Sequence, residues 1–167
     1  WGAGALGSAV VAVARALGAA PIVAVDPDAT ARAAALELGA DVALDPSGED
    51  FAEDLATASP ALDVVVHAAP DRGAAPAAVD AASSEGRVVL AGPADTVVPG
   101  KRWGTRLLTG PARVSPGSVQ VVAHLLAHGR LHLPPPPERP GGLAAAATAL
   151  DAALRGGHPL APALVRP

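Results

Sequence analysis

The stretch Gly2-Ala3-Gly4-Ala5-Leu6-Gly7 has the pattern G-x-G-x-x-G and opens a long apolar segment. In this pattern the first glycine, Gly2, permits a tight turn, and the second, Gly4, lets a pyrophosphate approach the backbone. The third, Gly7, lets the following helix pack closely on a strand. The pattern predicts the phosphate-binding turn of a dinucleotide-binding fold, although glycine-rich turns that bind nothing share it.

The apolar segment after the turn predicts a helix over residues 5–17, because it is rich in Ala, Val and Leu and stops at Gly18. The first N–H groups of a helix have no acceptor inside the helix. Ala5 and Leu6 begin this one, so we expect their end of the helix to receive the phosphates of a bound nucleotide.

Asp26 follows Gly7 by 19 residues and ends the next apolar segment. At this distance a carboxylate accepts hydrogen bonds from the adenosine ribose, and its negative charge repels the 2′-phosphate of NADP. We therefore expect NAD as cofactor, with NADP less favoured. Arg32, on the following helix, either contacts the ribose or is a solvated surface charge, and the sequence leaves both open.

Strands and helices alternate along the chain. We expect strands at 21–25, 41–44, 62–68, 86–92, 105–109 and 163–166, and further helices at 29–38, 51–58, 73–82, 119–128 and 143–154. Apolar strands that alternate with helices of this length form βαβ units. The prediction is an α/β fold of Rossmann type, with a doubly wound parallel sheet covered on both faces.

Ligands of such sheets bind beyond the carboxyl ends of the strands. Ala68 and Gly92 end two of the expected strands, so both are candidates to line the cofactor crevice. His67 lies at the same edge, where it either touches the ligand or is buried and hydrogen-bonded. The fold also requires a central strand before the turn. Because only Trp1 precedes Gly2, we expect that strand to come from upstream residues or from another segment.

Composition narrows the classes of partner. The net charge is −4 and no run of basic residues occurs, which argues against nucleic-acid binding. No apolar stretch of ~18 residues or signal-peptide pattern is visible, so we expect no membrane association and a cytoplasmic location. The absence of cysteine excludes disulfides and thiolate metal ligands within the sequence.

The order of these motifs resembles the medium-chain dehydrogenase/reductase (zinc-type alcohol dehydrogenase-like) superfamily. The similar segments are residues 2–7, 31–41, 62–66, 86–92, 124–131, 144–154 and 164–167. The resemblance implies a cofactor-binding domain at residues 1–130. Residues 131–167 would be the C-terminal piece of a GroES-like catalytic domain whose larger part lies outside the chain.

The resemblance also implies an oxidoreductase that transfers a hydride between NAD(H) and a small alcohol or carbonyl substrate. No catalytic or metal-binding residue is assigned here, and a zinc ion would use ligands outside this sequence. His124 and His128 are four residues apart on one expected helix, the spacing of a metal pair, but no third ligand accompanies them. A homo-oligomer formed through an edge strand at 105–116 is a further expectation.

Two other functions stay open. One is a non-catalytic nucleotide-binding or assembly module that descends from such an enzyme, because the chain contains no assigned catalytic residue. The other is an S-adenosylmethionine-dependent methyltransferase, which also uses a glycine-rich turn followed by an acid. The G-x-G-x-x-G spacing and the C-terminal segments argue against the methyltransferase.

Overall fold

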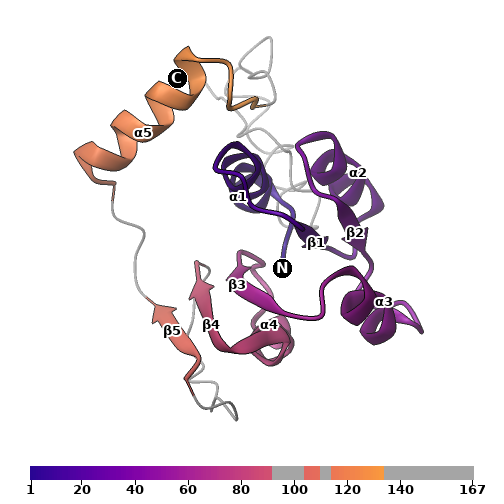
Figure 1. Ribbon diagram of the computed structural model, residues 1–167. Helices are drawn as coiled ribbons and strands as arrows, with labels where there is room; N and C mark the ends of the chain where they lie inside the picture. Colours follow the sequence, from indigo (N-terminus) through magenta and orange to yellow (C-terminus); the bar gives the residue numbers. More distant parts are fainter. Residues whose placement is uncertain (92–103, 110–113, 134–167) are drawn as a thin grey trace, which may run out of the picture.

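The computed structural model describes residues 1–91, 104–109 and 114–133. Its helices are α1 (Ala5–Ala16), α2 (Ala29–Glu37), α3 (Phe51–Ala58), α4 (Ala75–Ala81) and α5 (Pro116–Ala127), with a short 3-10 turn η1 (Arg72–Ala74). Its strands are β1 (Val23–Val25), β2 (Val42–Leu44), β3 (Leu62–His67), β4 (Ala82–Leu90) and β5 (Arg106–Thr109). The predicted alternation of helices and strands is confirmed (Figure 1). The elements expected at 143–154 and 163–166, and Gly92, lie outside the described residues.

Among the described residues every strand pairing is parallel, as predicted, but these strands form two sheets, one of β1 and β2 and one of β3, β4 and β5. The chain's first two residues join these sheets. The N–H of Gly2 donates to the Val25 carbonyl at 2.8 Å, and the Trp1 amino group donates to the Val66 carbonyl at 2.8 Å. The N–H of Ala68 donates to the Trp1 carbonyl at 2.7 Å. Trp1 and Gly2 therefore stand between β1 and β3, where the expected single sheet would continue.

Local chemistry explains the helix bounds. The Asp28 side chain accepts the Thr30 N–H at 2.8 Å and starts α2, and the Ser115 hydroxyl starts α5 in the same way. Gly18 and Gly39 have φ of +90° and +109° and follow the ends of α1 and α2.

β4 begins at Ala82, four residues before the predicted start at Gly86. Residues 83–85 are polar, and the sequence predicted a connection there between a helix and a strand. In the structure they belong to β4, whose register against β3 is irregular between Leu62 and Val64. Gly86 fits this irregularity, because a Cβ there would lie 2.9 Å from the Leu62 carbonyl oxygen.

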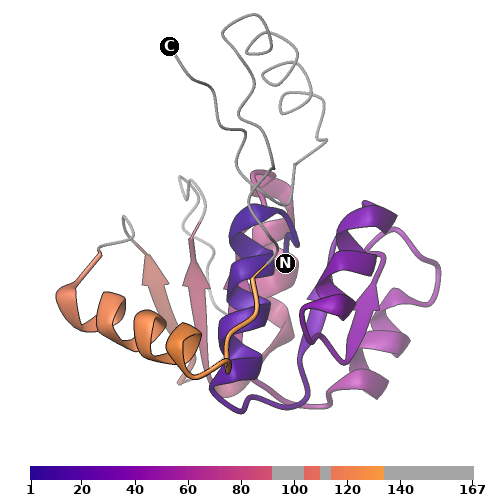
Figure 2. The ribbon, with the colours of Figure 1, turned by 90° about the horizontal axis from the view of Figure 1, so that it is seen from above.

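The core is built from small side chains, as the 2% aromatic content implies. One cluster lies between α1, α2 and β1, and a second between α4 and the β3–β4 strands. A third joins α1 to α5, where Leu125 and Leu131 pack on Ala12 and Ala16. Figure 2 shows the carboxyl end of α5 (orange) reaching α1 (indigo).

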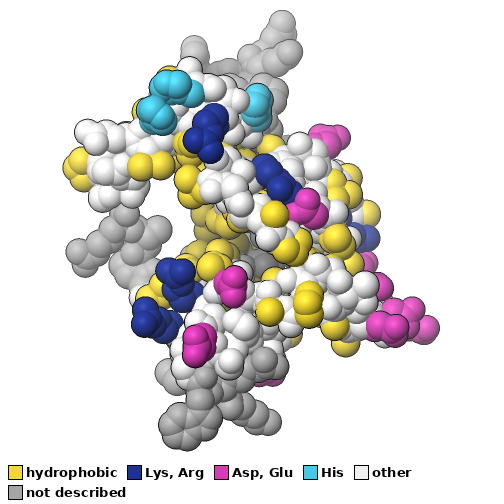
Figure 3. All heavy atoms as spheres, viewed as in Figure 1, with side chains coloured by type: hydrophobic (Ala, Val, Ile, Leu, Met, Phe, Trp, Pro, Cys, Tyr) yellow, Lys and Arg dark blue, Asp and Glu magenta, His cyan; other side chains and the backbone are white. Residues whose placement is uncertain are grey.

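The expectation that both faces of every strand are covered is wrong for the second sheet. Val65 and Val88 are buried beneath α4, whereas Val64 and Leu108 are each 51% exposed. The reason is that α5 packs on α1, and the molecule is hollowed between α5 and the β4–β5 strands (Figure 3).

Candidate nucleotide-binding site

Two of the three glycines in the turn are required by its geometry. Gly2 has φ of +86°, and a Cβ on it would lie 2.5 Å from the Ala69 nitrogen. A Cβ on Gly7 would lie 1.8 Å from the Gly2 carbonyl oxygen, so the helix touches the turn directly. Gly4 differs, because its φ of −64° and ψ of −164° suit any residue. The dihedral angles at position 4 therefore do not require glycine.

The start of α1 is open to a ligand. Gly4 is the N-cap, and no side chain in the described part of the chain caps the helix. The first intrahelical bond is donated by the Ser8 N–H to the Gly4 carbonyl, and the buried Ser8 hydroxyl donates to the Ala3 carbonyl at 2.7 Å. Ala5 and Leu6 are exposed and precede that bond, so their N–H groups lack helical acceptors. This end of the helix favours an anion.

The carboxylate of Asp26 lies against the turn. One of its oxygens accepts the Ala3 N–H at 2.7 Å, and the other accepts the Asp28 N–H at 2.8 Å. An ionised carboxylate offers about four acceptor positions, so further hydrogen bonds to Asp26 remain available. The end of β1 and the glycine turn thus form one site, although 23 residues separate Ala3 from Asp26.

Arg32 is turned away from the Asp26 carboxylate. Its Nη1 donates to the carbonyls of Asp26 and Pro27 at 2.8 and 2.9 Å, and to Asp45 Oδ2 at 3.0 Å. The hydroxyl and the N–H of Ser47 hold the pKa of Asp45 below its ordinary value, and the charge of Arg32 adds to this effect. Arg32 is therefore neither a free surface charge nor directed toward the side chain of Asp26.

The end of β3 reaches the same site. The Ala68 carbonyl carbon is 3.0 Å from the position of a Cβ on Gly2, which places this strand end against the turn. His67 is only 4% exposed, and its Nε2 has no hydrogen-bond partner among the described residues. Burial lowers the pKa of His67. The imidazole is consequently neutral at neutral pH.

The structure thus brings Gly2, Gly7, Asp26 and Ala68 together, and the sequence matches a known family over residues 5–112, more than half of the chain. That family is described as zinc-binding dehydrogenase. The chain belongs to the zinc-binding dehydrogenase family. It is accordingly a member of an oxidoreductase family, of the medium-chain, alcohol dehydrogenase-like type that the sequence resembles.

Solved structures share the fold. The alcohol dehydrogenase TADH from Thermus sp. ATN1 matches with a TM-score of 0.77 and 24% identity, over 99% of this chain and 51% of that one. A short chain alcohol dehydrogenase from E. coli CFT073, solved with NADH, matches with a TM-score of 0.71 and 22% identity, over 92% of this chain and 47% of that one. A quinone oxidoreductase from Pseudomonas syringae pv. tomato DC3000 matches with a TM-score of 0.73 and 23% identity, over 99% of this chain and 54% of that one. Among curated proteins no sequence matches.

This member of the zinc-binding dehydrogenase family spans about half the length of those proteins. The residues that the structure describes do not form a zinc site of their own. The sequence has no cysteine, and the described residues contain no group of three or more His, Cys, Asp or Glu that could hold a metal. The rings of His124 and His128 stack with centroids 4.1 Å apart, and His128 Nδ1 lies 2.9 Å from the His124 carbonyl oxygen.

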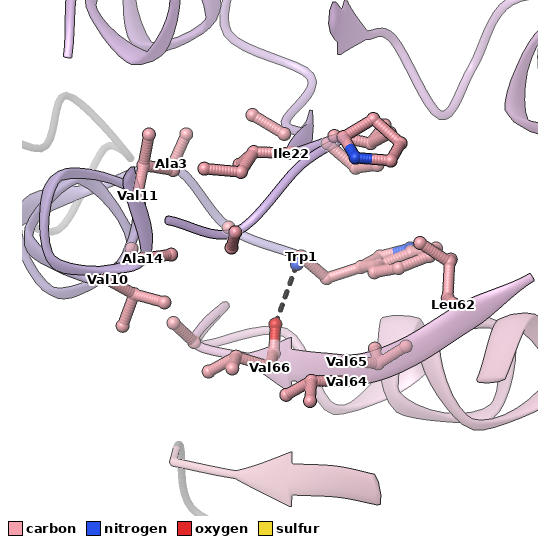
Figure 4. Close-up of a pocket in the computed structure, with 18 residues that line it drawn as sticks. Trp1, Ala3, Val10, Val11, Ala14, Ile22, Leu62, Val64, Val65 and Val66 are labelled. Carbon is pink, nitrogen blue, oxygen red and sulfur yellow. Dashed lines mark hydrogen bonds between the residues drawn. The ribbon is translucent and has the colours of Figure 1, made fainter. Parts of the chain in front are cut away.

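No helix in the described part is long and apolar enough to cross a membrane. An apolar cavity of about 170 Å³ does occur, but it lies behind the glycine turn, between the facing edges of β1 and β3 (Figure 4). Trp1, Val10 and Ala14 line it together with Ile22 and Val64. The cavity also touches Gly2, Ala3, Gly7 and Ala68, so it extends from the glycine turn and the end of β3 into the space between the two strands.

Sequence reasoning missed two residues of the site, Ser8 and Asp45. Ser8 is the single polar residue in the first turns of an apolar helix, and that position was the available signal. Asp45 follows β2 directly and carried no signal, because its contact with Arg32 depends on the pairing of β2 with β1.

Proposed function

We propose that this chain is the cofactor-binding half of an NAD-dependent oxidoreductase that transfers a hydride between NAD(H) and an alcohol or carbonyl substrate. The hydrogen bond of 2.7 Å from the Ala3 N–H to Asp26 carries the proposal. It sets the carboxylate expected at the adenosine ribose beside the turn expected at the pyrophosphate. Membership of the zinc-binding dehydrogenase family supports the same function.

Each part of the cofactor would be bound by different residues of the site. The open N–H groups of Ala5 and Leu6 would bind the pyrophosphate, and Gly4 would let it approach the backbone. Asp26 would accept the ribose hydroxyls, and Ala68, directly after β3, would face the nicotinamide half. When bound, the nicotinamide ring accepts or donates the hydride.

Cofactor binding to the intact protein tests this proposal. NADH fluorescence should rise on binding, and Asp26→Asn should weaken NADH because the ribose hydroxyls lose a charged acceptor. The same substitution should strengthen NADPH, because it removes a repelling charge. Asp63→Asn, an exposed substitution on β3, is the matched control. A wild-type protein that binds neither cofactor, or an Asp26→Asn variant that matches wild type, contradicts the proposal.

Turnover needs more than these residues. We propose that residues 1–130 form the cofactor domain, and that residues 131–167 belong to a catalytic domain completed outside this chain, where any zinc ligands would lie. Oxidation of small alcohols with NAD by the intact protein is the readout. Tight NAD binding without turnover of any alcohol or carbonyl would instead support a non-catalytic nucleotide-binding module.

The cavity between β1 and β3 supports one further part of this domain proposal, a strand between them. Trp1 and Gly2 form hydrogen bonds with both strands at one end of this cavity. Alternate residues of a strand direct their backbone groups to the same side, so the backbone groups of Val23 and Val64, nearer the amino ends of the two strands, also face the cavity. In the intact protein their amides should resist hydrogen exchange. Exchange at the rate of an open loop contradicts this part.

A further inference from the structure

We infer that Asp45 is a second determinant of cofactor choice, which acts with Asp26 by holding Arg32 away from the place of a 2′-phosphate. This inference rests on the proposed function and concerns the adenosine side of the same site. It assigns a role to an ion pair, Arg32–Asp45, that the glycine pattern does not predict.

Strand pairing makes the two acids neighbours. Val25 and Leu44 are partners in the parallel pairing of β1 with β2, and the Asp26 N–H donates to the Leu44 carbonyl at 3.1 Å. Asp26 and Asp45 are the next residues along each strand, so both lie at the carboxyl end of the sheet. Ligands of parallel sheets bind at this edge. A ribose held by Asp26 would therefore have Asp45 beside it.

Asp45 is itself fixed in place. Its Oδ1 accepts the Ser47 N–H at 2.9 Å and the Ser47 hydroxyl. Its Oδ2 accepts Arg32 Nη1 at 3.0 Å. The side chains of Arg32 and Asp45 are 22% and 35% exposed, so the pair is partly shielded from water. The turn after β2 thus presents one carboxylate oxygen to the guanidinium group.

Three acceptors hold the Nη1 atom of Arg32, namely Asp45 and the carbonyls of Asp26 and Pro27. A guanidinium group binds phosphate strongly through charge-assisted hydrogen bonds, and this is how dinucleotide-binding folds accept NADP. Here the positive charge is neutralised by Asp45. A 2′-phosphate would meet the carboxylates of Asp26 and Asp45, whereas Arg32 is already paired with Asp45.

Removal of the Asp45 charge should reverse this preference in part. In Asp45→Asn the isosteric amide keeps the side-chain volume, but Arg32 loses its ionic partner and can turn to a 2′-phosphate. We expect NADPH to bind at least about tenfold more tightly, because a hydrogen bond between charged groups is worth about 1.4 kcal/mol or more. NADH should change by less than about twofold, because Asp26 is intact.

The experiment is a fluorescence titration of the intact protein with NADH and with NADPH. It compares wild type, Asp45→Asn, Arg32→Gln and the double variant. Asp80→Asn, an exposed acid on α4, controls for the change in net charge. The expected result is a gain for NADPH in Asp45→Asn that disappears in the double variant and is absent in Asp80→Asn.

Competition with 5′-AMP and with adenosine 2′,5′-bisphosphate shows whether the gain belongs to the adenosine half. Only the bisphosphate should compete better in Asp45→Asn. An equal loss of NADH and NADPH affinity in that variant would assign Asp45 a structural role and overturn the inference. A gain that persists in the double variant would overturn the part played by Arg32. If wild type binds NADH and the NADPH affinity of Asp45→Asn equals that of wild type, the inference fails but the proposed function stands. If wild type binds neither cofactor, the proposed function fails as well.

Discussion

Gly7→Ala tests the close contact between α1 and the glycine turn. The added Cβ would lie 1.8 Å from the Gly2 carbonyl oxygen and 2.8 Å from its carbon. Carbon and oxygen atoms ordinarily approach to about 3.3 Å, so helix and turn must separate by roughly 1.5 Å. Both partners are backbone, which cannot move aside as a flexible side chain does. The cost should therefore reach the upper end of the range for overpacking, about 3 kcal/mol of unfolding free energy.

Calorimetry or urea unfolding of the intact protein measures this loss. For a folding unit of about 150–250 residues, about 3 kcal/mol corresponds to a fall in Tm of about 6–12 °C. Gly117→Ala is the matched control, because the nearest atom to its Cβ is the Ser115 hydroxyl oxygen at 3.9 Å, and position 117 lies in α5. That substitution should raise stability by about 0.5 kcal/mol. A Gly7→Ala variant as stable as wild type would refute the packing argument.

Three more predictions concern other parts of the molecule. Gly4→Ala should leave Tm within about 2 °C of wild type, because φ and ψ at position 4 suit alanine, but should weaken NADH binding at least about tenfold; a large fall in Tm, or unchanged NADH affinity, would contradict this. The pKa of His67 is lowered in the folded protein, so the unfolded chain binds a proton at this residue more readily. The free energy of unfolding should therefore be unaffected by His67 above pH 6.5 and should fall as the pH drops below 6.5. The urea midpoint of His67→Asn should therefore change less with pH below 6.5 than the midpoint of wild type. The same pH dependence in both proteins would show that His67 does not cause the loss of stability. If the intact protein is a dimer joined through the edge strand β5, Leu108→Lys should yield monomers in light scattering, and a persistent dimer would place the interface elsewhere.

The glycine turn, α1 and the position of Asp26 could be predicted because each depends on local constraints. A positive φ demands glycine at position 2, and the length of one helix and one strand fixes the distance to the acid. The number of sheets could not be predicted in this way. Periodicity reports which residues are apolar, whereas pairing depends on which edges meet, and here Trp1 and Gly2 stand between β1 and β3.

The role of Arg32 was undecidable from sequence for a similar reason. Its ionic partner, Asp45, is 13 residues away and reaches it because β2 pairs with β1. Polarity also misled at residues 83–85, where a strand irregularity accommodates residues that usually form a turn. In both cases a long-range backbone contact outweighed the local signal.

Core packing and the proposed cofactor preference depend on the same strand register. Val25 is 2% exposed, and its pairing with Leu44 sets Asp26 beside Asp45. A slip of one residue between β1 and β2 would turn Val25 to the other face of the sheet and also separate the two acids. The apolar contacts that stabilise this register therefore also maintain the charge arrangement at the proposed ribose site. Substitutions that loosen β2 should consequently relax the preference for NAD before they abolish folding.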